Sequence, residues 1–153
     1  MVARGDLAIE AGLEVVPIVQ RKLLAYARQH AKLVIVATQM LGSMVDNPEP
    51  NRAEVNDVAT AVIMGADVTM LSDESANGKY PIEAIKTMKK IILYTQDHAK
   101  MQGIETEPVG DFKNYDAIAV AAVKIAEDID ADLIVAATHT GATANAIAAA
   151  RPN

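Results

Sequence analysis

The sequence contains no cysteine and few aromatic residues, and each shortage removes a class of function. Without cysteine the chain can form no disulfide, no thiolate nucleophile and no zinc–thiolate site. Aromatic residues make up 3% of the chain, and 14 basic residues stand against 20 acidic ones, for a net charge of -6. Such a chain offers neither a basic stripe for a phosphate backbone nor a platform on which bases could stack. We therefore expect no nucleic-acid partner.

Long apolar runs are also missing. Hydrophobic residues make up 51% of the chain, yet no run approaches the roughly 20 apolar residues that a membrane span needs. The start of the chain, Met1–Asp6, lacks the basic and apolar pattern of a signal peptide. With 153 residues the chain is long enough for one ordinary domain with a substantial core. We expect a cytoplasmic protein without a membrane partner.

The chain is organised around one short strand and the polar residues that follow it. The aliphatic run Leu33–Ala37 has no polar alternation, which predicts a strand that is covered on both faces. Thr38 and Gln39 end this run, and Pro48 separates it from a helix that we expect to begin near Arg52. In α/β folds ligands bind at the carboxyl ends of the strands. The pattern therefore predicts a binding site after this strand.

Similar units precede and follow this one. Predicted strands start near positions 1, 33 and 67, in steps of 32 and 34 residues. Strand–helix units of this length with buried strands are typical of parallel βα repeats. The predicted helices cover 13–31, 52–64 and 81–101, with inward residues Val16, Val19, Leu23, Leu24 and Ala27 in the first and Val55, Val58, Ala59 and Val62 in the second.

The last part of the chain departs from this spacing. A polar linker at 102–114 precedes a helical stretch at 115–131, and the next predicted strand, 132–137, starts 65 residues after the third. The doubled interval predicts a change of domain within the linker. One parallel strand with one helix cannot close a core, so we expect an incomplete second unit.

Four motifs occur in order and at fitting spacing. They are Met1–Leu7 with Ala-Arg-Gly-Asp, Val36–Leu41, Arg52–Glu54 followed by Asp57–Ala59, and Met70–Pro81. Together they closely resemble pyruvate kinase over nearly the whole chain. The resemblance implies the last three units of a (β/α)8 barrel over 1–101, a linker at 102–114, and the start of a second α/β domain over 115–153. It also implies that the chain is a segment of a longer protein.

At the first strand end, the resemblance assigns roles to three neighbouring residues. It implies that Asp6 binds the Mg²⁺ (or Mn²⁺) that holds phosphoenolpyruvate, and that amides around Gly5 and Asp6 receive the substrate carboxylate. A carboxylate at a strand end suits a hard divalent cation, although a lone aspartate there is also typical of a helix cap. Arg4 either contacts the substrate phosphate or orders neighbouring loops.

At the next two strand ends, the resemblance implies proton transfer. The position of Thr38 is that of a threonine that lines the substrate pocket and protonates the enolate. Ser72 and Glu74 correspond to a proton-delivery network, because a carboxylate beside a hydroxyl can pass a proton. Judged from the residues alone, all three could instead cap local turns. Since they end consecutive parallel strands, we expect them to share one mouth with Asp6.

The resemblance also concerns assembly. Arg52 starts a helix, where a cation opposes the helix dipole, and the resemblance implies that it crosses a subunit interface of a homotetramer. The alternative is a solvated surface arginine. The three histidines lack metal-ligand spacing. We expect His30 and His98 on the surface near helix ends, whereas His139 precedes a turn whose N–H groups could meet an anion.

Some expected groups are replaced or missing. Asp73 stands where the family usually has glycine, Asn51 where it has threonine, and Gly42 where it has an acidic residue. The family's catalytic lysine, second magnesium carboxylate, K⁺ ligands and nucleotide lid have no counterpart here. We therefore expect a piece of an enzyme that transfers a phosphoryl group from phosphoenolpyruvate to ADP in glycolysis, with the segment alone inactive. A non-catalytic anion-binding module or an assembly module is the alternative.

Overall fold

The computed structural model describes residues 1–30, 32–99, 114–150 and 152. The chain divides into two compact units, Met1–Ala25 with Leu33–Glu105 and Tyr26–Lys32 with Thr106–Asn153. The linker predicted at 102–114 lies outside the described residues, except for its last residue. Among the described residues, no helix is both long enough and apolar enough to cross a membrane.

The first unit is built on a three-stranded parallel sheet in the order β1-β2-β3. Its strands are β1 (Val2–Ala3), β2 (Ile35–Ala37) and β3 (Val68–Met70). Val36 of β2 pairs with Val2 on one side and with Thr69 on the other. The side chain of Val36 is fully buried, as expected for a strand that is covered on both faces. The predicted parallel βα repeat is confirmed.

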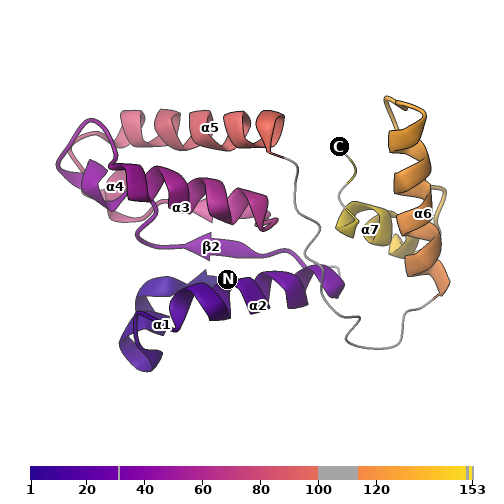
Figure 1. Cartoon of the computed structure of the whole chain (residues 1–153), viewed down its shortest axis with the longest axis horizontal. Coiled ribbons are helices and arrows are strands. Elements are labelled where there is room, and N and C mark those ends of the chain that lie inside the picture. Colours follow the sequence, from indigo (N-terminus) through magenta and orange to yellow (C-terminus); the bar gives the residue numbers. More distant parts are fainter. Residues whose placement is uncertain (31, 100–113, 151, 153) are drawn as a thin grey trace. The chain divides into compact units, whose positions relative to one another are not determined.

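Helices connect the strands and cover the sheet. In Figure 1, β2 lies between α2 on one side and α3 and α5 on the other. After β1 come α1 (Arg4–Ala11) and α2 (Val16–Gln29), after β2 come the 3-10 helix η1 (Gly42–Val45) and α3 (Arg52–Ile63), and after β3 come α4 (Asp73–Ala76) and α5 (Pro81–His98). These are three successive βα units, as in the last part of a (β/α)8 barrel.

The helix boundaries follow from local signals. Asn51 caps α3 and accepts a hydrogen bond from the Glu54 amide, while the Glu54 carboxylate accepts one from the Asn51 amide. This reciprocal capping box satisfies two amides that otherwise have no partner. Gly65 ends the same region with a φ of 83°, a conformation that glycine adopts readily. Pro81 is the first residue of α5, where a proline costs no helical hydrogen bond.

The core of the first unit lies between the sheet and the helices. Its fully buried residues come from β2, from the segment after it, and from one side of the helices. They include Leu24, Val36, Ala37, Met40, Leu41, Met44, Val58, Ala61 and Ala84. Met40 and Met44 fill irregular space just beyond the strand, a role that suits the unbranched methionine side chain.

Several details of the prediction for this unit are wrong. Helix α1, which begins at Arg4 directly after β1, was not among the predicted helices. In α2, Leu24 is buried and Leu23 is 42% exposed, because adjacent helical residues point about 100° apart. In α3, Val58, Ala61 and Val62 are buried, whereas Val55, expected to face inward, is exposed. Helix α5 ends at His98, short of the predicted end at 101.

Apart from the end of α2, the second unit contains two helices and no strand among its described residues. Helices α6 (Asn114–Asp128) and α7 (Ala142–Ala149) pack together, with Ala119, Val123 and Ala146 buried. The strand predicted at 132–137 does not form. A strand needs a neighbour for its backbone groups, and no described residues of this unit supply one. Leu133 and Val135 of this segment are accordingly exposed.

Candidate active site

Polar residues from the carboxyl ends of all three strands meet in the first unit. The Arg4 side chain, directly after β1, donates hydrogen bonds to the backbone carbonyl of Thr38 after β2. The amide of Leu41, also after β2, donates to the carboxylate of Glu74 after β3. Hydrogen bonds therefore link the end of β1 to that of β2 and the end of β2 to that of β3, while a common mouth with Asp6 stays a prediction. The catalytic and binding roles of these residues stay predictions.

Arg4 is a buried cation whose guanidinium group donates hydrogen bonds to other groups of the protein. The residue is 7% exposed. Its Nε and Nη2 atoms lie 3.1 and 2.6 Å from the Thr38 carbonyl oxygen, and Nη2 lies 3.0 Å from that of Gln39. Its Nη1 atom forms an ion pair of 2.6 Å with Asp57. These contacts favour an arginine that orders neighbouring loops, and a substrate contact by Arg4 stays a prediction.

Gly5 and Asp6 occupy the first turn of α1. The Gly5 amide donates a 2.9 Å hydrogen bond to Thr38 Oγ1, and a Cβ added at Gly5 would lie 3.6 Å from that oxygen. Amides in the first turn of a helix lack intrahelical partners and attract anions. Asp6 is exposed, and among the described residues its carboxylate forms no hydrogen bond or ion pair. The carboxylate is thus free to take a ligand.

Thr38 and Gln39 form a corner with an unusual backbone conformation. Their φ angles are 73° and 53°, in the left-handed region that residues with a Cβ seldom adopt, least of all β-branched ones. The corner turns the chain sharply out of β2. As a result, the Thr38 side chain faces the start of α1 and the Thr38 carbonyl faces Arg4.

Glu74 is a buried carboxylate, 2% exposed, in the short helix α4. Its Oε1 atom accepts a hydrogen bond from the Leu41 amide at 3.0 Å, and its Oε2 atom accepts one from the Ser72 amide at 2.8 Å. Both carboxylate oxygens therefore have a backbone partner, as a buried acid requires. Ser72 directly precedes α4, and its contact with the Glu74 carboxylate is made by the backbone amide, so a proton relay through the Ser72 hydroxyl stays a prediction.

The unusual Asp73 fits its position. It is the first residue of α4, where a negative charge is favoured by the helix dipole, and it is not among the residues with positive φ. Its Oδ1 atom accepts a hydrogen bond from Asn77 Nδ2. Asp73 therefore occupies this position without the left-handed conformation that glycine adopts most readily.

Arg52 and its neighbours mark the start of α3. Arg52 is exposed, and within the described part of the chain it forms no hydrogen bond or ion pair. Glu54 bonds backward to the loop after β2, because its Oε1 atom accepts from the Ser43 amide at 2.6 Å and its Oε2 atom accepts from the Ser43 hydroxyl. An interface role for Arg52 stays a prediction.

Sequence reasoning missed two acidic residues that organise this region, Asp57 and Glu54. Both belong to one of the motifs on which the resemblance rests. However, an acidic residue in an amphipathic helix is normally interpreted as a solvent-exposed charge. Two partners of these acids, Arg4 and Ser43, lie 53 and 11 residues away along the chain. The contact between Arg4 and Asp57 could have been predicted only by pairing the cation after β1 with an acid in α3.

His30 and His98 are exposed, and each bonds through Nδ1 to a backbone carbonyl four residues earlier, that of Tyr26 and Tyr94. Their predicted surface positions near helix ends are confirmed. In the turn before α7, the Gly141 amide donates to Thr138 Oγ1. Anion binding at this turn stays a prediction.

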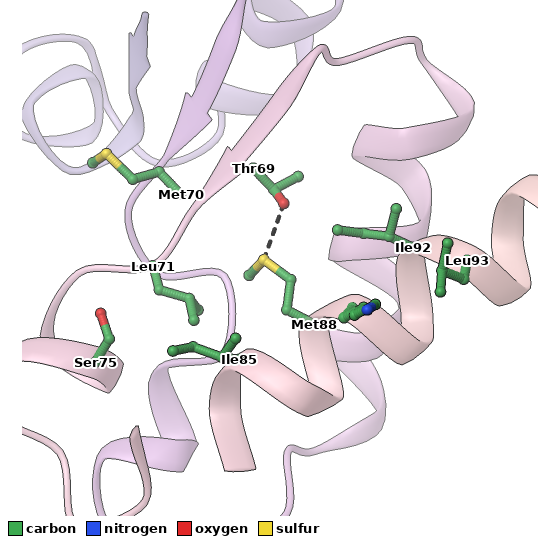
Figure 2. A pocket seen from close by; sticks show the side chains of 9 residues that line it. Thr69, Met70, Leu71, Ser75, Ile85, Met88, Ile92 and Leu93 are labelled. Atoms are coloured by element: carbon green, nitrogen blue, oxygen red, sulfur yellow. Dashed lines mark hydrogen bonds between the residues drawn. The ribbon is translucent and has the colours of Figure 1, made fainter. Parts of the chain in front are cut away.

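A hollow of about 440 Å³ lies between β3 and α5 and extends to Ser75 of α4. Figure 2 shows Met88 of α5 pointing toward Thr69 of β3, with Thr69 Oγ1 and Met88 Sδ 3.0 Å apart. Among its lining residues, all in the described part of the chain, only Lys89 carries a charge. This apolar hollow holds no set of groups suited to acid–base chemistry.

The fold and the site together define a class of protein. Parallel βα units with polar groups gathered at the carboxyl ends of the strands are characteristic of βα-barrel enzymes. A family model for the barrel domain of pyruvate kinase matches residues 1–85, and a model for the alpha/beta domain of pyruvate kinase matches residues 116–153. The chain belongs to the pyruvate kinase family.

Individual relatives agree with this assignment. The chain is 50% identical to a pyruvate kinase of Methylorubrum extorquens, and the matched region covers 100% of this chain and 32% of the relative. It is 47% identical to one of Mycobacterium intracellulare, over 97% of the chain and 31% of the relative. A pyruvate kinase from Cryptosporidium parvum, known from a crystal structure, is 37% identical in sequence to this chain. The two structures superpose with a TM-score of 0.84 over 98% of this chain and 31% of the other. The chain thus spans about a third of the length of these relatives.

Proposed function

We propose that this chain forms part of the active site of a pyruvate kinase, which transfers a phosphoryl group from phosphoenolpyruvate to ADP and yields pyruvate and ATP in glycolysis. The supporting observation is the hydrogen-bonded cluster at the ends of three adjacent parallel strands. In this proposal residues 1–101 belong to the catalytic barrel, 102–114 to a linker and 115–153 to the C-terminal α/β domain.

Substrate binding is assigned to the start of α1 and the corner after β2. The Gly5 amide, which now donates to Thr38 Oγ1, is a donor suited to a carboxylate at a helix N-terminus. The neighbouring Asp6 amide and the Thr38 side chain complete the proposed contacts. Arg4 donates a hydrogen bond to the Thr38 carbonyl and contributes its positive charge to the same proposed site.

Proton transfer is assigned to Thr38, Ser72 and Glu74. The Thr38 hydroxyl accepts a hydrogen bond from Gly5, and its own O–H proton stays available for donation. We assign it the protonation of the enolate carbon that remains after the phosphoryl group has left. The buried Glu74, whose carboxylate accepts a hydrogen bond from the Ser72 amide, and the Ser72 hydroxyl would return a proton to that site, since a carboxylate and a hydroxyl together can relay one.

Metal dependence is general in the pyruvate kinase family, and Asp6 is the residue here that suits a divalent cation. Its exposed carboxylate offers a hard oxygen ligand of the kind that Mg²⁺ or Mn²⁺ prefers. The described residues include no group of three or more possible metal ligands, so Asp6 would supply one ligand of a larger set. The cation, when bound, neutralises charge on the substrate. The proposal includes K⁺, with its ligands outside this chain.

Assembly and location complete the proposal. Arg52 is exposed at the start of α3 without a partner among the described residues, and we assign it to an interface with a second subunit of a homotetramer. A cytoplasmic location belongs to the same proposal. The substrates phosphoenolpyruvate and ADP and the other subunits are the expected partners, with no nucleic acid and no membrane.

A hybrid enzyme tests the function. This chain replaces the matching third of the Methylorubrum extorquens relative, and pyruvate formation is followed in a coupled assay with Mg²⁺ and K⁺. We expect turnover by the hybrid and none by the chain alone. Thr38→Val should lower kcat by about 100-fold or more, as loss of a general acid does, whereas the control Thr69→Val, in the apolar hollow, should change it little. Equal activity of the two variants would contradict the assignment.

One observation favours a second candidate, an assembly module without catalysis. Both β1 and β3 are edge strands of the described sheet, and unpaired strand edges favour association with other chains. A hybrid that assembles and binds phosphoenolpyruvate but gives no turnover would favour this candidate, or an anion-binding module of the same fold, over the enzyme.

A further inference from the structure

The corner after β2 is strained and depends on distant residues. Thr38 and Gln39 are consecutive, both carry a Cβ, and both have left-handed φ angles of 73° and 53°. Conformations of this kind persist only where surrounding contacts enforce them, and they gather at functional sites. The corner therefore needs contacts from elsewhere in the first unit to hold it.

Arg4 holds the backbone of both strained residues. Two of its nitrogens donate to the Thr38 carbonyl, at 2.6 and 3.1 Å, and one of these also donates to the Gln39 carbonyl at 3.0 Å. A planar guanidinium group presents its donors in a fixed fork. In the left-handed form of the corner, both carbonyls face this one guanidinium group.

Asp57 in turn holds Arg4. Its Oδ2 atom lies 2.6 Å from Arg4 Nη1, with the arginine side chain 9% exposed and the aspartate 36% exposed. Asp57 lies one turn into α3, next to the buried Val58. The capped helix is thus the fixed support of the chain of contacts from Asp57 through Arg4 to the corner.

We propose that Asp57 is a positioning residue: through Arg4 it keeps the Thr38–Gln39 corner left-handed and so holds the Thr38 hydroxyl against the Gly5 amide. The effect on the backbone follows from the geometry alone. The effect on catalysis rests on the proposed function, in which the Thr38 hydroxyl donates the proton.

A surface ion pair of the same unit provides a matched control. Asp46 and Lys79 lie 2.8 Å apart, and both side chains are more than two-thirds exposed. Neither of them touches the corner. Asp57→Ala and Asp46→Ala therefore each remove one ion pair, and only the first removes support from Arg4.

The first experiment is NMR spectroscopy of the chain itself. In the wild type, Thr38 and Gln39 should show the strong intraresidue HN–Hα NOE that a positive φ produces. Asp57→Ala should abolish this signature and speed hydrogen exchange of the Gly5 amide by about tenfold, whereas Asp46→Ala should leave both unchanged. An Asp57→Ala variant that keeps the signature and the Gly5 protection would overturn the proposal.

Rescue by glycine separates positioning from a general loss of structure. Glycine adopts the left-handed conformation without steric cost, so Gln39→Gly removes the strain at one of the two corner residues and should restore part of the Gly5 protection in the Asp57→Ala background. If Asp57→Ala alone does not fold, the double variant should fold and show this protection. If glycine restores none of the Gly5 protection, Asp57 acts by another route.

The catalytic consequence is measured in the hybrid enzyme. Asp57→Ala should lower kcat by about tenfold or more with KM changed less than threefold, because the hydroxyl that it positions acts in a chemical step. A loss confined to KM would contradict this step. A wild-type hybrid without turnover would overturn the proposed function alone, since the NMR results test the corner independently.

Discussion

Replacing Glu74 by glutamine tests whether the buried carboxylate joins the second and third strand ends. The carboxylate is 2% exposed, and its two oxygens accept hydrogen bonds from the amides of Leu41 and Ser72. Glutamine keeps the shape but has one acceptor oxygen, so its NH2 group must face one of these amides. One buried donor then loses its partner.

The expected cost can be worked out from these contacts. An unsatisfied buried amide costs about 1–3 kcal/mol, and hydrogen bonds to a charged acceptor are roughly twice as strong as neutral ones. We therefore expect Glu74→Gln to lower the free energy of unfolding by about 2–3 kcal/mol. For a unit of roughly 100 residues, 1 kcal/mol corresponds to about 4–8 °C in Tm, which predicts a fall of about 10 °C or more.

The assay is thermal unfolding followed by circular dichroism, with Glu83→Gln as the matched control. Glu83 lies in the first turn of α5 and is exposed, so its loss should cost less than about 1 kcal/mol. If Glu74→Gln unfolds within about 3 °C of the control, the two hydrogen bonds do not stabilise the fold as argued. A rise in Tm would mean that the cost of burying the charge exceeds the strength of its hydrogen bonds.

Three further predictions concern local features of the first unit. Asn51→Ala removes the cap of α3 and should cost about 1 kcal/mol in urea unfolding; an unchanged midpoint would contradict the capping role. Gly78→Ala places a Cβ 2.6 Å from the Glu74 carbonyl oxygen and should cost about 1–3 kcal/mol, so a neutral result would refute the close contact. The hydrogen bond to Asp46, together with its charge, raises the pKa of Lys79 above its ordinary value of 10.5. Any stabilisation by this pair is therefore complete below pH 10.5 and is lost as the pH rises through the folded-state pKa; an NMR titration in which Asp46→Asn does not lower that pKa would contradict the pairing.

Much of the first unit could be read from the sequence because its signals are local. The start of α3 at Arg52 follows from an asparagine and a glutamate three residues apart, which cap each other. The first residue of α5 follows from a proline, whose missing N–H costs nothing there. The strands follow from short aliphatic runs that recur at βα spacing. Because parallel strands end at the same edge, the meeting of Thr38 with the first strand end was predictable as well.

The errors arose where burial depends on partners that the sequence does not name. Val55 lies at a plausible inward spacing, yet the neighbours of α3 cover Val58 and Ala61 instead. The aliphatic run at 132–137 has strand character, but among the described residues of the second unit it has no strand beside it. A pattern of side chains predicts a strand, and only a neighbouring strand allows one to form.

The sequence by itself determined the repeat, the first residues of α3 and α5, the family resemblance and the polar residues at the strand ends. Only the tertiary structure decided how those residues are held. The left-handed corner at Thr38 and Gln39 is unfavourable as local structure, so no local pattern predicts it. It exists because hydrogen bonds between distant residues oppose its local cost. Arg4 lies 34 residues from Thr38 along the chain, and Asp57 lies 53 residues from Arg4. Local backbone preferences depend on neighbouring residues in the sequence. A strained conformation depends instead on contacts that exist only once the chain has folded.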